Sequence, residues 1–177
     1  GANPIAVVSS EEKGQFLKRM VGCERYIIRT KYDIACMPNE TPEGKAKRTE
    51  ETKKFGKAVR EVTGGQDPDI VFEHVGRETF PTSVFVAKRF GKIVICGATT
   101  GFDLTFDVRH LWMRQKQIIG SHFCNAYQAE RANRLVIEGK IKPVLDQVFD
   151  FNGIPEAHAL MAANKHKGKI GIGIHCA

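Results

Sequence analysis

The sequence lacks the features that mark membrane-spanning and secreted proteins. No apolar run approaches the roughly 18 residues needed to cross a bilayer, and residues 1–4 lack the basic-then-apolar layout of a secretory signal. Its five cysteines are odd in number and widely spaced, and none forms a Cys-x-x-Cys pair. This argues against a disulfide framework and against a structural zinc site. We therefore expect a cytoplasmic protein with no membrane partner and no metal.

The chain carries a net positive charge, but the arrangement of its basic residues does not indicate binding to nucleic acid. The chain has 27 Lys and Arg against 20 Asp and Glu, which gives a net charge of +7 and a pI near 9.2. The basic residues concentrate between positions 45 and 57, but glutamates at 43, 50 and 51 alternate with them, as on a solvated face. No aromatic side chains are interleaved for base stacking. Anionic nucleotides such as NADPH, or a coenzyme A ester, explain the bias equally well, so we expect no nucleic-acid partner.

Short β-branched runs alternate with helical stretches along most of the 177 residues. Strands are predicted at 5–8, 26–28, 69–72, 92–96 and 117–121, and helices at 11–20, about 49–62, 78–88, 108–114 and 126–138. Residues 31–48, which carry two prolines, are predicted to be a surface insertion. Apolar strands separated by helices predict an α/β fold: a Rossmann-like, doubly wound parallel sheet. Residues 142–177 differ, with strands at 144–149 and 169–174 around a helix near 155–164, so we predict domains at 1–141 and 142–177.

Ligands of such sheets bind at the loops that leave the carboxyl ends of the strands. In a dinucleotide fold, the loop at positions 9–13 would meet the adenosine ribose. Hydroxyls and cations there favour the 2′-phosphate of NADPH through charge-assisted bonds. The residues are Ser9, Ser10, Lys13 and Arg29. Glu11 and Glu12 oppose this interpretation unless the helix turns them outward, and an ordinary serine cap beside a solvated lysine explains the pattern equally well.

Two further strand exits are predicted to line the cofactor. Gly97, Ala98 and Thr99 follow one strand, where glycine allows backbone to approach a planar ring and the threonine can donate or accept a hydrogen bond. His74 and Val75 follow another strand and are assigned to the cofactor wall. Most glycine-bearing strand exits are simply turns, so this motif is weak by itself.

One histidine occupies a position suited to catalysis. His122 ends a predicted strand, next to Phe123, which we place at the cofactor. An imidazole can donate a proton or hydrogen-bond a carboxylate near neutral pH. A histidine at a strand end is more often structural, and the residues alone leave both roles open.

Four stretches together resemble one family. They are 4–10 (PIAVVSS), 69–80 (DIVFEHVGRETF), 111–113 (LWM) and 118–123 (IIGSHF) with Asn125. In combination they resemble the crotonyl-CoA carboxylases/reductases, enoyl-CoA carboxylases/reductases of the zinc-independent medium-chain dehydrogenase/reductase superfamily, over essentially the whole chain. The resemblance implies NADPH-dependent reduction of a 2-enoyl-CoA to an enolate that attacks carbon dioxide, giving an alkylmalonyl-CoA. It also implies a homo-oligomer, a dimer or a tetramer.

The resemblance assigns a role to His122, because the histidine of the family's Gly-Ser-His-Phe motif helps to hold carbon dioxide. The family's N-terminal catalytic domain is absent from this sequence, as are the first strand and the glycine-rich turn that would precede residue 1. Residues 142–177 would return to complete that catalytic domain. Cys124, where a smaller residue is expected, and the segment 125–128 depart from the family and put fine substrate choice in doubt.

The missing strand leads to an expectation about folding. The strand order 3-2-1-4-5-6 would leave the strands at 5–8 and 69–72 on either side of an empty slot. We therefore expect residues 1–177 not to form an autonomous domain, and to aggregate or unfold over a broad transition when purified alone.

Two other functions stay open on the sequence, and a third is disfavoured. One is a plain NADPH-dependent enoyl-CoA reductase, such as an acryloyl-CoA reductase, in which His122 assists protonation. Another is a non-catalytic basic domain that binds a nucleic acid or protein. A zinc alcohol dehydrogenase is disfavoured, since the clustered structural-zinc cysteines are missing.

Overall fold

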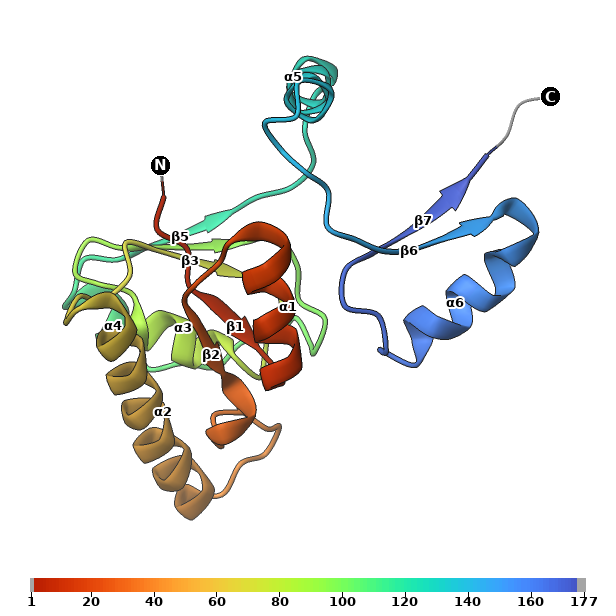
Figure 1. The fold of residues 1–177 in the computed structure, drawn as a ribbon. Coiled ribbons are helices and arrows are strands. Elements are labelled where there is room, and N and C mark those ends of the chain that lie inside the picture. Colours follow the sequence, from red (N-terminus) through yellow and green to blue (C-terminus); the bar gives the residue numbers. More distant parts are fainter. Residues whose placement is uncertain (1, 175–177) are drawn as a thin grey trace. The chain divides into compact units, whose positions relative to one another are not determined.

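The computed structural model describes residues 2–174 (Figure 1). Of these, residues 2–11 and 25–123 form one compact unit, and residues 12–24 and 124–174 form the other. Within the described range, no helix is both long enough and apolar enough to cross a bilayer. The predicted strand 169–174 falls inside this range, whereas His175, to which we assign no role, lies outside the described residues.

The first unit contains two parallel sheets. Strands β1 (Ala6–Val8) and β2 (Tyr26–Ile28) pair with each other, and β3 (Ile70–Glu73), β4 (Lys92–Ile95) and β5 (Gln117–Gly120) form a three-stranded sheet in that order. Parallel strands joined by helices confirm the predicted fold class. Among the described residues, β1 and β3 do not pair with each other.

The helices of the first unit connect and cover these strands. They are η1 (Arg29–Lys31), α2 (Pro42–Thr63), α3 (Phe80–Val86) and α4 (Arg109–Trp112). Strand β3 is covered unevenly: Val71 packs against the core, but Phe72 is 65% exposed. The alternation follows from the pleat, which turns successive side chains to opposite faces.

The second unit holds a separate parallel pair of strands. These are β6 (Leu145–Asp150) and β7 (Lys169–Gly173), with η2 (Phe151–Gly153) and α6 (Ile154–Ala162) between them. The same unit contains most of α1 (Glu11–Val21) and all of α5 (Ala126–Ile137). Helix α5 begins with a capping box, in which the side chains of Asn125 and Gln128 each accept a backbone N–H of the other residue.

Helix α2 starts seven residues before its predicted beginning, so the interpretation of residues 42–48 as a surface insertion is wrong. Thr41 caps the helix, because its Oγ1 accepts a hydrogen bond from the backbone N–H of Gly44 at 3.1 Å. Pro42 occupies the first helical position, where its fixed φ suits the helix and its missing N–H is not needed. The proline that suggested a loop therefore begins the helix.

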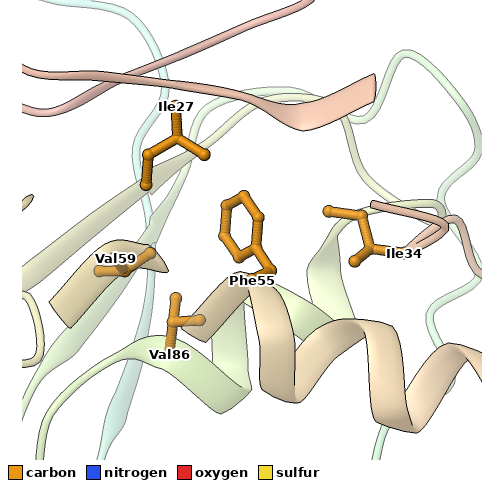
Figure 2. Close-up of a cluster of buried hydrophobic side chains, with 5 residues drawn as sticks. All are labelled: Ile27, Ile34, Phe55, Val59 and Val86. Atoms are coloured by element: carbon orange, nitrogen blue, oxygen red, sulfur yellow. The ribbon is translucent and has the colours of Figure 1, made fainter. Parts of the chain in front are cut away.

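Two apolar clusters hold the first unit together. In Figure 2, Phe55 of α2 lies among Ile27 of β2, Ile34, Val59 and Val86. This cluster joins the β1–β2 pair to α3 through α2. The second cluster fills the space between α3 and the three-stranded sheet. Its buried members are Phe80, Val84, Ala87 and Ile93.

A lysine side chain from outside helix α3 binds the carbonyl groups at the C-terminal end of this helix. The Lys116 ammonium donates hydrogen bonds to the carbonyl oxygens of Val84 and Phe85, at 2.6 and 3.1 Å. These carbonyls lie in the last turn, where a helix leaves its acceptors unpaired and a positive charge is favourable. Partial burial nevertheless lowers the pKa of Lys116 to about 8.

Candidate functional site

The carboxyl ends of three strands meet at one edge of the first unit. Glu73 at the end of β3 lies opposite Ile95 of β4, which in turn lies opposite Gly120 of β5. The loops that follow are residues 74–79, 96–101 and 121–123. This is the edge at which ligands of parallel α/β sheets bind.

The first two of these loops are joined by backbone hydrogen bonds. The Thr99 N–H donates to the His74 carbonyl at 3.3 Å, and the Thr100 N–H donates to the Val75 carbonyl at 2.8 Å. The Arg77 N–H donates back to the Gly101 carbonyl at 3.2 Å. The structure therefore brings the predicted cofactor residues of the two loops side by side. His74 and Thr99 are exposed there, and Val75 is half-buried.

Glycines permit this close approach. Gly76 has a φ of +93°, and a Cβ at this position would lie 2.7 Å from the Gly101 carbonyl oxygen and 2.8 Å from the Ala98 Cα. At Gly97 a Cβ would lie 3.3 Å from the His74 carbonyl oxygen. A side chain at Gly76 would push the loops apart, so this glycine is required by contact as well as by conformation.

A buried carboxylate organises the first loop from beneath. Glu73 is only 4% exposed, and its Oε1 accepts hydrogen bonds from the N–H groups of Val75 and Gly76 at 2.8 and 3.2 Å. The Thr79 hydroxyl donates to both carboxylate oxygens, and the Ser83 hydroxyl donates to Oε2. The side chain thus ties the loop after β3 to the start of α3.

Glu73 was not predicted from the sequence, because a glutamate at a strand end is typical of an exposed polar position. A signal was present: Thr79 and Ser83 are four residues apart, which places both hydroxyls on one face of a helical turn. Two hydroxyls on one face below a strand-ending carboxylate predict a buried polar cluster.

The third strand end carries His122 and Phe123. The Ser121 N–H donates to the Ile95 carbonyl at 2.8 Å, which fixes the start of this loop against β4. The two rings lie with their centroids 3.8 Å apart, and both side chains are exposed. Phe123 has a φ of +51° and is 90% exposed. A non-glycine residue in this conformation beside a candidate catalytic group is typical of functional loops.

The residues predicted to hold a 2′-phosphate lie at the ends of the other strand pair. Ser9 and Ser10 follow β1, and Arg29 follows β2 at the start of η1. The Thr30 hydroxyl donates to the Ser9 carbonyl at 3.0 Å and ties the two strand ends together. Lys13 belongs to the second unit, in the first turn of α1, so the structure does not place it against the other three.

The two glutamates that opposed a phosphate site are each engaged elsewhere. The Tyr26 hydroxyl donates a hydrogen bond to the Glu11 carboxylate. In the second unit, the Lys167 ammonium lies 2.5 Å from the Glu12 carboxylate. That hydrogen bond and the positive charge of Lys167 lower the pKa of Glu12. Tyr26 and Lys167 are therefore partners of these two carboxylates.

Comparison with known proteins places the chain in a family. The zinc-binding dehydrogenase family matches residues 1–138. The chain belongs to this family. Within residues 2–174, however, no group of three His, Cys, Asp or Glu side chains could hold a metal ion. The described residues therefore do not fit a zinc site.

Individual proteins of this family show which members the chain is similar to. The chain is 46% identical over 172 residues to the crotonyl-CoA reductase of Streptomyces avermitilis, covering 97% of this chain and 38% of that protein. It is 44% identical over 171 residues to the crotonyl-CoA carboxylase/reductase of Cereibacter sphaeroides, covering 94% and 39%. The solved structure of crotonyl-CoA carboxylase/reductase AntE in complex with NADP is 40% identical, with a TM-score of 0.86, covering 96% and 42%.

These matches confirm the resemblance drawn from the sequence motifs. The chain spans about two fifths of the length of these relatives. The domain boundary at 141 and the roles of the site residues stay predictions.

Proposed function

We propose that this chain is part of an NADPH-dependent oxidoreductase that reduces and carboxylates a 2-enoyl-CoA of the crotonyl-CoA type, giving an alkylmalonyl-CoA. The observation that carries the proposal is the identity of 44 to 46% to crotonyl-CoA reductases and carboxylases/reductases, which extends over 94 to 97% of the chain. The family match over residues 1–138 includes every loop of the candidate site. In the full-length protein, residues 1–141 would bind NADPH, and residues 142–177 would return to the catalytic domain.

The residues of the first unit suit NADPH. Serine hydroxyls and the Arg29 guanidinium at the ends of β1 and β2 can bond a phosphate. The joined loops after β3 and β4 offer a planar ring a backbone wall, since Gly97 carries no side chain and the Thr99 side chain is exposed beside it. NADPH, when bound, supplies the hydride for the β-carbon of the enoyl thioester.

The role of His122 is to hold carbon dioxide at the reacting carbon. An imidazole N–H donated to one oxygen of carbon dioxide stabilises the negative charge that forms there, as the α-carbon of the enolate makes its bond to the carbon of carbon dioxide. The Phe123 ring lies beside the imidazole, with the ring centroids 3.8 Å apart and the ring planes tilted by 43°.

Product analysis tests this function. The full-length protein is incubated with crotonyl-CoA and NADPH, with and without bicarbonate and carbonic anhydrase, and the thioesters are identified by mass spectrometry. We expect ethylmalonyl-CoA when carbon dioxide is supplied and butyryl-CoA when it is not. Butyryl-CoA alone under both conditions would refute carboxylation and favour a plain enoyl-CoA reductase. Salt-sensitive nucleic-acid binding without either reaction would favour a basic binding domain.

We also propose a cytoplasmic, homo-oligomeric enzyme, a dimer or a tetramer. The five cysteines are odd in number and widely spaced, which supports a reducing compartment. Mass photometry of the full-length protein tests the oligomeric state, and a monomer would contradict it.

A further inference from the structure

The side chain of Arg77 covers the backbone of a neighbouring loop. Arg77 lies in the loop after β3, and Gly101, whose carbonyl accepts its backbone N–H, lies in the loop after β4. A Cβ on Gly101 would lie 2.3, 2.5 and 2.9 Å from the Nη2, Cζ and Nε atoms of Arg77. Because Cζ is nearly as close as Nη2, Gly101 lies against the flat face of the guanidinium. The side-chain N–H groups lie in the plane of the guanidinium, so they do not point at Gly101.

The half-buried arginines of this protein are of two kinds. Within residues 2–174 they are Arg29, Arg48 and Arg77. The Nε and Nη2 groups of Arg48 each donate to the Glu40 carboxylate at 2.9 Å. In the part of the chain that the structure describes, no carboxylate or carbonyl oxygen accepts a hydrogen bond from the Arg77 guanidinium. The same holds for Arg29, which we assign to the 2′-phosphate of NADPH.

An anionic ligand would supply an acceptor for Arg77. Holding a guanidinium partly out of water without an acceptor is unfavourable, and Arg77 lies at the edge where ligands of parallel sheets bind. The planar fork of a guanidinium matches the oxygens of a phosphate and binds them through charge-assisted hydrogen bonds. Gly101 supports one face of the group, so its donors are oriented before a ligand arrives. The position therefore suits a phosphate of a bound nucleotide.

A dinucleotide carries negative charge on the diphosphate that joins its two halves and, in NADPH, also on the 2′-phosphate. The 2′-phosphate is assigned to residues at the ends of β1 and β2. Arg77 belongs to the other sheet of the first unit, in a loop that we assign to the cofactor, so the diphosphate is the anionic group that remains for it. The glycine-rich turn of a dinucleotide fold offers the diphosphate backbone N–H donors, to which Arg77 would add a full positive charge.

We propose that Arg77 binds the diphosphate of the dinucleotide and that Gly101 leaves room for its guanidinium. This inference rests on the proposed use of NADPH. NADPH and NADH share the diphosphate, so Arg77 contributes to the affinity for both cofactors. Arg29, at the 2′-phosphate, contributes to the choice between them.

Binding measurements test this role without catalysis. Isothermal titration calorimetry on the full-length protein gives the dissociation constants of NADPH, NADH and coenzyme A. We expect Arg77→Ala to weaken NADPH and NADH binding alike, about tenfold or more, the scale of a charge-assisted hydrogen bond, and to leave coenzyme A unchanged. Arg29→Ala should weaken NADPH alone. Arg114→Ala removes the same charge from an exposed position and should leave all three constants unchanged.

A double-mutant cycle tests the contact with Gly101. Gly101→Ala should displace the guanidinium and weaken both dinucleotides as Arg77→Ala does, whereas in an Arg77→Ala background it should have no further effect. Equal losses in both backgrounds would overturn the role of Gly101, because backbone strain at its φ of +136° would then be the cause. Circular dichroism melts monitor folding. Arg77→Lys keeps the charge and the aliphatic stem, so it should show a smaller loss and gives the comparison if Arg77→Ala is unstable.

The possible results separate this site from the proposed cofactor. Unchanged dinucleotide binding in every folded Arg77 variant would overturn the site and leave the use of NADPH intact. A loss confined to NADPH would place Arg77 at the 2′-phosphate, and a loss confined to coenzyme A would place it at the thioester substrate. Either result would overturn the assignment to the diphosphate of the dinucleotide. If the unmodified protein binds neither dinucleotide, the proposed function itself fails.

Discussion

Gly76→Ala tests how closely the loops after β3 and β4, residues 74–79 and 96–101, are joined. Gly76 has a φ of +93°, which costs a residue with a Cβ about 1 to 2 kcal/mol. The added Cβ would also meet the Gly101 carbonyl oxygen at 2.7 Å and the Ala98 Cα at 2.8 Å. Carbon atoms pack at about 3.5 to 4.0 Å, and both obstacles are backbone, so the loops must separate.

The separation acts on specific hydrogen bonds. The bond from Thr100 N–H to Val75 and the bond from Arg77 N–H to Gly101 lie on either side of Gly76. Each contributes about 0.5 to 1.5 kcal/mol net. Weakening both adds about 1 to 3 kcal/mol to the conformational cost, for a total loss of about 2 to 5 kcal/mol in the free energy of unfolding.

Gly65→Ala is the matched control. Gly65 has nearly the same φ, +94°, but nothing lies within 4 Å of its would-be Cβ. It should lose only the conformational part, about 1 to 2 kcal/mol. Urea unfolding of the full-length variants gives the difference, and hydrogen–deuterium exchange of peptides 73–79 and 96–101 shows where it arises. Equal losses for both variants, with exchange unchanged in the two loops, would refute the close approach at Gly76.

Three further predictions concern charge and catalysis. Replacing Arg29 by Ala should raise the NADPH KM about tenfold or more, since a charge-assisted bond contributes about 1.5 to 3 kcal/mol, and leave the NADH KM nearly unchanged; equal increases for both cofactors would contradict the 2′-phosphate assignment. His122→Ala should lower the ratio of carboxylated to simply reduced product, measured by mass spectrometry, whereas an unchanged ratio with a slower rate would assign His122 to reduction or packing. Burial lowers the pKa of Lys116 to about 8, so above that pH the unfolded chain binds more protons than the folded chain, and the free energy of unfolding should rise from about pH 8 to 10.4. Lys116→Met should remove the contribution of Lys116 to this rise, as measured by urea unfolding at several pH values. Identical pH profiles for the variant and the parent protein would contradict the prediction.

Much of the fold could be predicted because its signals are local. Apolar runs such as residues 92–95 and glycines such as Gly22 and Gly64, both at positive φ, mark strands and helix ends within a few positions of sequence. The start of α2 was predicted wrongly because Pro42 is compatible with two structures. Proline favours loops in general but also the first turn of a helix, and the Thr41 cap decides between them.

That the loops after β3, β4 and β5 lie at one edge could be predicted, because the carboxyl ends of parallel strands share an edge. What the sequence could not supply was the partner of each polar group. Tyr26 and Glu11 are fifteen residues apart, and nothing in either residue's neighbourhood indicates that they bond. Pairings of this kind depend on the register of β1 against β2, which is set by packing across the whole sheet.

Glu73 shows the same limit at the centre of the site. A carboxylate that is 4% exposed would be strongly destabilising without partners, so its burial requires donors from the loop and from α3 at once. The two N–H groups come from residues two and three positions on, and the hydroxyls from six and ten positions on. Only when α3 packs against β3 do these four donors converge. The burial of Glu73 and the shape of the loop that it holds are therefore coupled, and the loop after β3 takes its shape only when the core beneath it has formed.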